Sequence, residues 1–192
     1  MTTAGHELWL ISRAAGIVAL VLVSTSVLLG LTLAAGFAGP PQRRKNLITF
    51  HEHAANAALV AIAVHGAALL GDPFLKPGLK GIVIPFAIDY RPVYVAAGIL
   101  GGYAAALLGL SFYARKRVGA KRWRKLHRAT PVVYVLGLIH TLGAGTDQGS
   151  SWLRAFMLAS AIAAGALITT RVRRSLKRSR KPGNISVNPT EI

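Results

Sequence analysis

The sequence predicts an all-α membrane protein, a bundle of about five transmembrane helices with the N-terminus outside and the C-terminus in the cytoplasm. Hydrophobic residues make up 53% of the 192 residues and charged residues only 15%. Charged residues form about 25% of a typical soluble domain. Five stretches of the chain carry few or no charges, and about 20 apolar residues are enough for a helix to cross a bilayer. Composition and length together therefore favour a membrane bundle.

Taken in order, the spans are expected at residues 8–37, 47–70, 92–113, 123–143 and 152–171. The first is interpreted as a retained span, because its apolar run exceeds that of a signal peptide. The loop at 73–91 contains breaker residues, and its segment 82–86 is expected at the membrane interface. Pro131 falls in the first turns of the fourth span. We expect one transmembrane bundle over residues 1–172 and a basic, disordered cytoplasmic tail over residues 173–192.

Charge fixes the expected orientation. The net charge is +17, and 18 of the 23 Lys and Arg residues fall on one side when the chain is threaded through five spans. Short cytoplasmic loops carry such an excess, so this side is expected inside a cell (inner or plasma) membrane. The basic residues alternate with spans, which favours contact with anionic lipid and argues against nucleic acid as a partner.

The sequence contains no cysteine. This excludes disulfides, iron–sulfur clusters, thiolate ligation of haem and covalent haem attachment through a C-x-x-C-H motif. Any haem in this protein would therefore be bound without a covalent link.

Four histidines lie within the apolar segments: His51 and His65 in the second span, His127 and His140 in the fourth. Ionisable residues inside a membrane are costly and point to function. The two spans run in the same direction, and the histidines match in depth, His51 with His127 inside and His65 with His140 outside. Neutral imidazole is a common axial ligand of haem iron. The pattern predicts two b-type haems, each held by one histidine from each span.

Helical geometry supports one pair of positions better than the other. The 14 residues from His51 to His65 span roughly 20 Å of helix. Around the helix axis, the directions of the two side chains differ by about 40°. The 13 steps from His127 to His140 leave them about 140° apart on a straight helix, unless Pro131 kinks or rewinds it. His53 is a rival for His51, but it lies about 120° from His65.

Other interpretations of these residues stay open at this point. A single histidine in a span is often a buried polar group bonded to a neighbouring helix, and a histidine proton relay is a further possibility. A zinc site is disfavoured because the pairs are too far apart to converge. Arg13 on the outer side and Arg128, with Arg124, on the inner side would be partners for haem carboxylates, or would simply contact lipid headgroups.

The spacing His51-x13-His65 followed by His127-x12-His140 resembles the ferric reductase-like transmembrane domain superfamily. That family includes the membrane parts of ferric reductases and NADPH oxidases and the membrane subunit of the bacterial periplasmic methionine sulfoxide reductase. The stretch Trp123-Arg-Lys-Leu-His127-Arg128, followed by Leu138-Ile-His140, is most similar to the bacterial members. The resemblance covers all five spans, although many relatives have six.

The resemblance implies two non-covalent b-type haems with His51, His65, His127 and His140 as ligands, and electron flow across the membrane. The chain has no Gly-rich dinucleotide motif, so a separate donor, a flavin reductase or a membrane quinol, would supply electrons to an external acceptor. Whether the chain is itself an enzyme depends on that acceptor. The alternatives are a haem-free channel or transporter that uses its histidines for protons, and an anchoring subunit without chemistry.

Overall fold

The computed structural model describes residues 3–179, and these residues form helices and no strands. The helices are α1 (Thr3–Ala34), α2 (Pro41–Leu69), α3 (Gly78–Val83), α4 (Pro92–Leu110), α5 (Arg115–Val118), α6 (Ala120–His127), α7 (Thr130–Ala144) and α8 (Ser151–Ser179). The predicted all-α membrane class is confirmed. Of the predicted tail, residues 173–179 continue α8 and residues 180–192 lie outside the described part of the chain.

Four of these helices, α1, α2, α4 and α8, are long and apolar enough to cross a membrane. The segment expected as one further span, residues 123–143, is instead divided into α6 and α7. Proline lacks an N–H, so Pro131 leaves the carbonyl four residues earlier without its helical donor. That carbonyl belongs to His127, and the hydroxyl of Thr130 donates to it at 2.8 Å. The helix therefore ends at His127 and restarts at Thr130.

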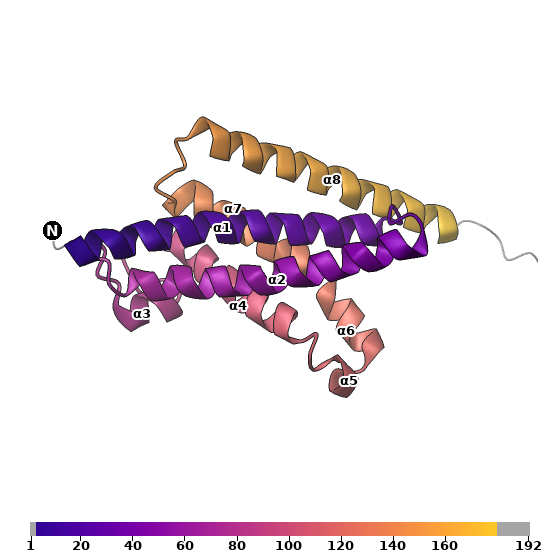
Figure 1. Cartoon of the computed structure of the whole chain (residues 1–192), viewed down its shortest axis with the longest axis horizontal. Helices are drawn as coiled ribbons and strands as arrows, with labels where there is room; N and C mark the ends of the chain where they lie inside the picture. The colour runs from indigo at the N-terminus through magenta and orange to yellow at the C-terminus, as the bar shows by residue number, and fades with distance from the viewer. Residues whose placement is uncertain (1–2, 180–192) are drawn as a thin grey trace, which may run out of the picture.

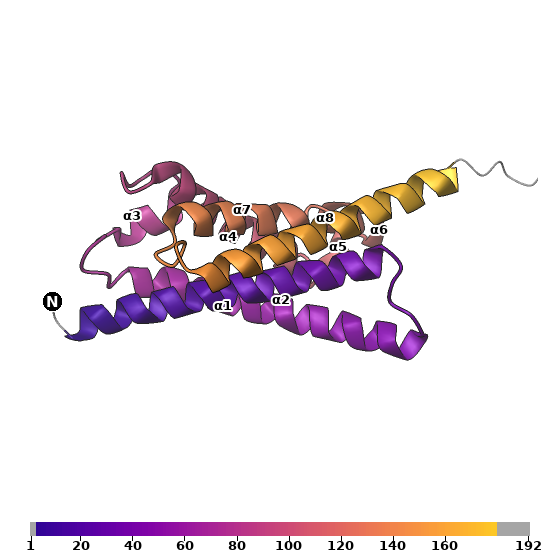
Figure 2. The ribbon, with the colours of Figure 1, turned by 90° about the horizontal axis from the view of Figure 1, so that it is seen from above.

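Two helix pairs and one flanking helix make up the bundle. α1 packs closely along α2, and α4 packs along α7. Figure 1 shows α1 and α2 as antiparallel neighbours along the long axis of the molecule, and Figure 2 shows α8 crossing over α1. On α8, Leu153 and Met157 pack with Leu20 of α1, and Tyr134 of α7 joins α8 through a 2.7 Å hydrogen bond to Ser160.

The outer surface of the bundle suits lipid. Large apolar side chains on the long helices remain exposed, among them Val60 of α2, Leu107 of α4 and Ile162 of α8 at 64%, 73% and 64% of their area. A membrane would cover such side chains, whereas in water they would form an aggregation-prone surface. The basic helices α5 and α6 and the end of α8 lie toward one end of the molecule, and α3 lies toward the other (Figure 1).

Candidate functional site

The structure brings the four span histidines together in the two predicted pairs. The ring centroids of His51 and His127 are 6.0 Å apart, with an angle of 84° between the ring planes. Those of His65 and His140 are 6.1 Å apart at 74°. We call the first the inner pair and the second the outer pair, following the orientation expected from charge. The break between α6 and α7 removes the mismatch of about 140° expected for a straight helix and lets His127 of α6 and His140 of α7 both face α2.

The separation within each pair fits two ligands on opposite sides of one metal ion. A metal–imidazole bond of about 2.0 Å plus the radius of the ring places each centroid about 3 Å from the metal. Two such ligands in line have centroids about 6 Å apart, which is the spacing observed in both pairs. The residues present therefore fit bis-histidine ligation.

Three of the four imidazoles are oriented by a backbone carbonyl. The Nδ1 atom of His51 lies 2.7 Å from the carbonyl oxygen of Ser26, and that of His65 lies 2.8 Å from the carbonyl oxygen of Ser12. His140 Nδ1 lies 2.9 Å from the carbonyl oxygen of Tyr94. A carbonyl oxygen can only accept a hydrogen bond, so each Nδ1 must carry the proton, and each Nε2 of the neutral ring keeps its lone pair. In a metal-ligating histidine, a hydrogen bond from the ring nitrogen that does not bind the metal typically fixes the tautomer.

His127 is the exception. Its Nδ1 atom is buried and has no hydrogen-bond partner in the described part of the chain, and the same holds for Nε1 of Trp123. The two rings stack with centroids 4.9 Å apart and planes at 24°. His127 is also the last residue of α6. The ring is therefore held by stacking at a helix end rather than by a hydrogen bond.

His53, the rival for His51, points elsewhere. Its side chain is exposed, and its Nδ1 lies 2.8 Å from the carbonyl oxygen of Thr49 on its own helix. It thus faces away from the inner pair, as its position about 120° from His65 would lead one to expect.

Each histidine pair opens on a cavity between the helix pairs. The outer cavity has a volume of about 520 Å³ and is lined by α1, α2, α4 and α7, and by Asp72 and the segment around α3. The inner cavity measures about 870 Å³ and is lined by α1, α2, α4 and the α6–α7 region. Ligand pockets commonly span about 300–1,000 Å³ and are mostly apolar. Both cavities are therefore large enough for a bound cofactor.

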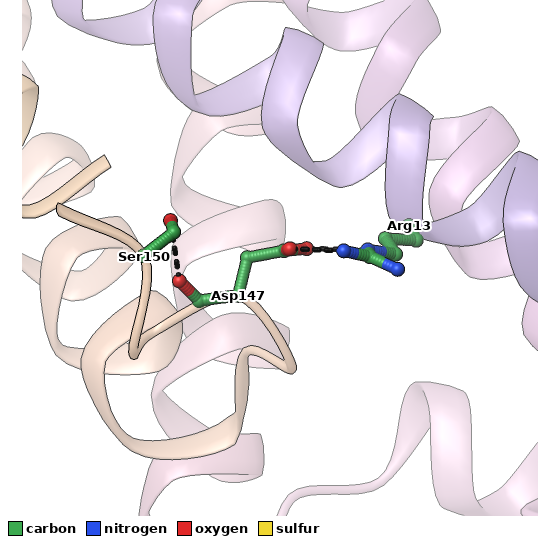
Figure 3. A network of polar contacts seen from close by, with 3 residues as sticks. All are labelled: Arg13, Asp147 and Ser150. Carbon is green, nitrogen blue, oxygen red and sulfur yellow. Dashed lines mark hydrogen bonds and ion pairs between the residues drawn. The ribbon is translucent and has the colours of Figure 1, made fainter. Parts of the chain in front are cut away.

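The arginines expected near a cofactor differ in their surroundings. Arg13 lines the outer cavity and forms an ion pair with Asp147 in the α7–α8 loop, its Nε donating at 2.5 Å (Figure 3). The hydrogen bonds from Arg13 hold the pKa of Asp147 below its ordinary value. Ser150 donates to the backbone carbonyl of Asp147 at 2.8 Å and fixes the loop. Arg128 and Arg124 line the inner cavity.

Residues 3–179 contain no cluster of three or more His, Asp, Glu or Cys side chains that would hold a metal ion by themselves. A haem iron needs fewer protein donors, because the porphyrin supplies four nitrogens and the protein supplies only the axial ligands. Two histidines beside each cavity are a donor set that suits such a group.

The family model described as ferric reductase like transmembrane component matches residues 15–138 of the chain. This chain belongs to that family. The match includes His51, His65 and His127 and ends two residues before His140. No curated protein and no solved structure matches the chain significantly. Membership of the ferric reductase-like family indicates a function in membrane electron transfer, and domains of this family commonly bind haem.

The sequence arguments did not identify the residues that orient the histidines. Backbone carbonyls carry no sequence signature of their own, so Tyr94 could not have been found. A signal did exist on the first span, where Ser12 and Gly16 are repeated as Ser26 and Gly30. That repeat has a period of 14 residues, the same as the spacing of His51 and His65 on the neighbouring helix.

Proposed function

We propose that this chain is an integral-membrane di-haem electron-transfer protein of the b type. It would take electrons from a cytosolic donor or a quinol and pass them to an acceptor on the other side of the membrane. The single observation that carries the proposal is the spacing of the two histidine pairs, 6.0 and 6.1 Å between ring centroids, which suits axial ligation of one iron by each pair.

In this proposal His51 and His127 hold the inner haem, and His65 and His140 hold the outer one. The proton stays on Nδ1 of His51, His65 and His140, because a carbonyl accepts it there. Nε2 is then the metal-binding atom, and its basicity is raised by the hydrogen bond on the opposite side of the ring. When bound, the haems would supply one-electron carriers. Their proposed ligands on α2, His51 and His65, are roughly 20 Å apart along the helix.

Arg13 and Arg128 are the proposed partners of haem carboxylates, since they line the outer and the inner cavity respectively. Charge-assisted hydrogen bonds from arginine suit carboxylates. At the outer cavity Arg13 is shared with Asp147, so a haem carboxylate there would compete with, or extend, an existing ion pair.

The proposed orientation follows the charge distribution. The basic helices α5 and α6 and the basic end of α8 would face the cytoplasm of a cell that carries this protein in its inner or plasma membrane. The bundle would then comprise residues 1–172, and the basic residues after it would lie in the cytoplasm. A separate flavin reductase or membrane quinol would serve as the donor at the inner end.

Purification of the full chain in detergent tests the proposal. The expected preparation is red, shows the reduced-state absorption bands of b-type haem and contains about two haems per chain by the pyridine haemochrome method. Replacing His65 or His140 by Ala is expected to remove the outer haem and leave the inner one. His53→Ala is the matched control, because His53 is an exposed histidine on α2, and it is expected to keep both haems.

A colourless, folded preparation would contradict the proposal. It would favour the alternatives of a haem-free channel or transporter that moves protons through the histidines, or of an anchoring subunit. Loss of haem in His53→Ala with retention in His51→Ala would contradict the assignment of the inner ligand.

A further inference from the structure

The three carbonyls that hold the ligand histidines share one feature of sequence. Each is followed four residues later by a glycine: Ser12 by Gly16, Ser26 by Gly30 and Tyr94 by Gly98. Glycine accounts for 20 of the 192 residues, so composition alone does not explain three glycines at three such positions. The residue that supplies the carbonyl varies between Ser and Tyr. The common element is therefore the glycine.

Helix geometry explains why the glycine matters. In an α-helix the carbonyl of residue i accepts from the N–H of residue i+4. The Cβ of residue i+4 leans toward the N-terminus and lies on the same face as residue i. It therefore shields the carbonyl of residue i from a donor on a neighbouring helix. Without a Cβ at this position, the carbonyl can accept a second hydrogen bond from the side.

The contacts around the glycines agree with this reasoning. A Cβ built on Gly16 would lie 3.0 Å from Nδ1 of His65, and one built on Gly30 would lie 3.2 Å from Cε1 of His51. A Cβ on Gly98 would lie 2.7 and 2.8 Å from Cε1 and Cγ of His140. Each glycine is thus in contact with the imidazole that its helix orients, and alanine would push the ring away from the carbonyl.

The hydroxyls on α1 provide an internal comparison. Ser24, Thr25 and Thr32 donate to the carbonyl four residues earlier in their own helix, at 2.7–2.8 Å. Ser12 and Ser26 instead donate across to the backbone carbonyls of His65 and His51, at 3.2 and 3.4 Å. These two hydroxyls therefore brace the same two histidines that the carbonyls orient, whereas the other hydroxyls stay within the helix.

We propose that Gly16, Gly30 and Gly98 are positioning residues, each of which uncovers the carbonyl four residues earlier so that it can hold Nδ1–H of a ligand histidine. α1, which supplies no ligand, thereby orients one histidine of each pair. The proposal rests on the proposed function, because it concerns the ligands of the two haems. It assigns Gly16 and Gly98 to the outer haem and Gly30 to the inner haem.

The test is reductive titration of the purified full chain, with haem content and midpoint potentials measured in Gly16→Ala, Gly30→Ala and Gly98→Ala. The titration curve is expected to contain two components, one for each haem. His65→Ala and His51→Ala identify which component belongs to the outer and which to the inner site. When the hydrogen bond from Nδ1–H to the carbonyl is lost, Nε2 donates less electron density to the iron. The reduced form of the iron is then favoured. We therefore expect the outer potential to rise, or the outer haem to be lost, in Gly16→Ala and Gly98→Ala. Gly30→Ala is expected to change only the inner component.

Gly165→Ala on α8 is the matched control, because a Cβ built there meets no atom within 4 Å apart from its own helix backbone and chain neighbours. It is expected to leave the potentials of both haems unchanged. Wild-type protein with two haems whose potentials are unaffected by Gly16→Ala and Gly30→Ala would overturn this inference and leave the proposed function intact. Equal shifts of both components in each variant would overturn it as well. Folded wild-type protein without haem would instead overturn the proposed function. Should Gly98→Ala fail to fold, Gly16→Ala carries the outer-site test, since its added Cβ makes the milder contact.

Discussion

The outer and inner histidine pairs have the same spacing but are supported differently. In the outer pair both rings are fixed, His65 by the carbonyl of Ser12 and His140 by that of Tyr94. In the inner pair only His51 is fixed, by the carbonyl of Ser26. His127 stacks on Trp123 and leaves its buried Nδ1 without a partner among the described residues. The outer site is therefore preorganised from both sides and the inner site from one.

The difference shows how a broken helix affects a ligand. His140 lies well inside α7 and faces α4, where Gly98 leaves a carbonyl accessible. His127 ends α6, just before the break that Pro131 imposes. The break gives His127 the correct direction toward His51, but it also removes the ring from the helix packing that would supply a carbonyl. We expect the inner haem to be the more weakly held of the two.

The largest expected difference is therefore in the retention of haem. With an excess of apomyoglobin as the acceptor, the wild-type chain is expected to release its haems in two phases, the inner one about five- to tenfold faster. The factor reflects the hydrogen bond that His127 lacks at Nδ1, since one such bond contributes about 1 kcal/mol net to stability. Stopped-flow absorbance follows the release, and His65→Ala, which is expected to lack the outer haem, identifies the inner phase. A faster outer phase would reverse the comparison.

Trp123→Ala sharpens the comparison at the inner site. Removing the stacked ring takes away the remaining support of His127, an aromatic contact worth about 1 kcal/mol. We expect release of the inner haem to accelerate about fivefold while the outer phase stays the same. Trp152→Ala is the matched control, because Trp152 is 53% exposed on α8. An effect of Trp123→Ala on the outer phase would show that the two sites are not independent.

The smallest expected effect concerns the ion pair beside the outer cavity. Because Arg13 lowers the pKa of Asp147, the pair stabilises the folded protein above the ordinary carboxyl pKa of about 4. This contribution is lost as the pH falls through the lowered pKa. Exposed pairs contribute less than about 1 kcal/mol, so Asp147→Asn is expected to cost a few tenths of a kcal/mol.

Thermal unfolding in detergent measures this cost, with Asp89→Asn as a control at an exposed carboxylate. The difference between wild type and Asp147→Asn is expected at pH 7 and should shrink as the pH falls below about 4, toward the lowered pKa of Asp147. A difference that persists unchanged down to the lowest pH at which the protein stays folded would mean that the ion pair is not its source.

Much of the fold could be predicted because apolar length and breaker residues are local signals. Helix α4 begins at Pro92, as expected, and α2 ends at Leu69, one residue from its expected end. The start of α2 was predicted less well, because the helix begins at Pro41 and not near residue 47. The division of residues 123–143 was not predicted, because Pro131 is tolerated in a first turn and the apolar pattern continues through it. Only the angular mismatch of His127 and His140 pointed to a break.

The candidate site was predictable as far as side chains define it. Ionisable residues in an apolar span are rare enough for His51, His65, His127 and His140 to stand out. What orients them was not predicted, because a carbonyl becomes available only through the packing of two helices. The role inferred for Arg13 was incomplete for a similar reason: its partner Asp147 lies more than 130 residues away in sequence, and only the tertiary structure brings the two together.

The central claim is that the histidines act in two specific pairs, and haem content of double alanine variants tests it most directly. Removing one whole pair, His65 with His140 or His51 with His127, is expected to leave about one haem per folded chain. Removing one histidine from each pair, His65 with His127, is expected to leave none. Retention of one haem in the His65/His127 variant, or loss of both when only one pair is removed, would contradict the pairing.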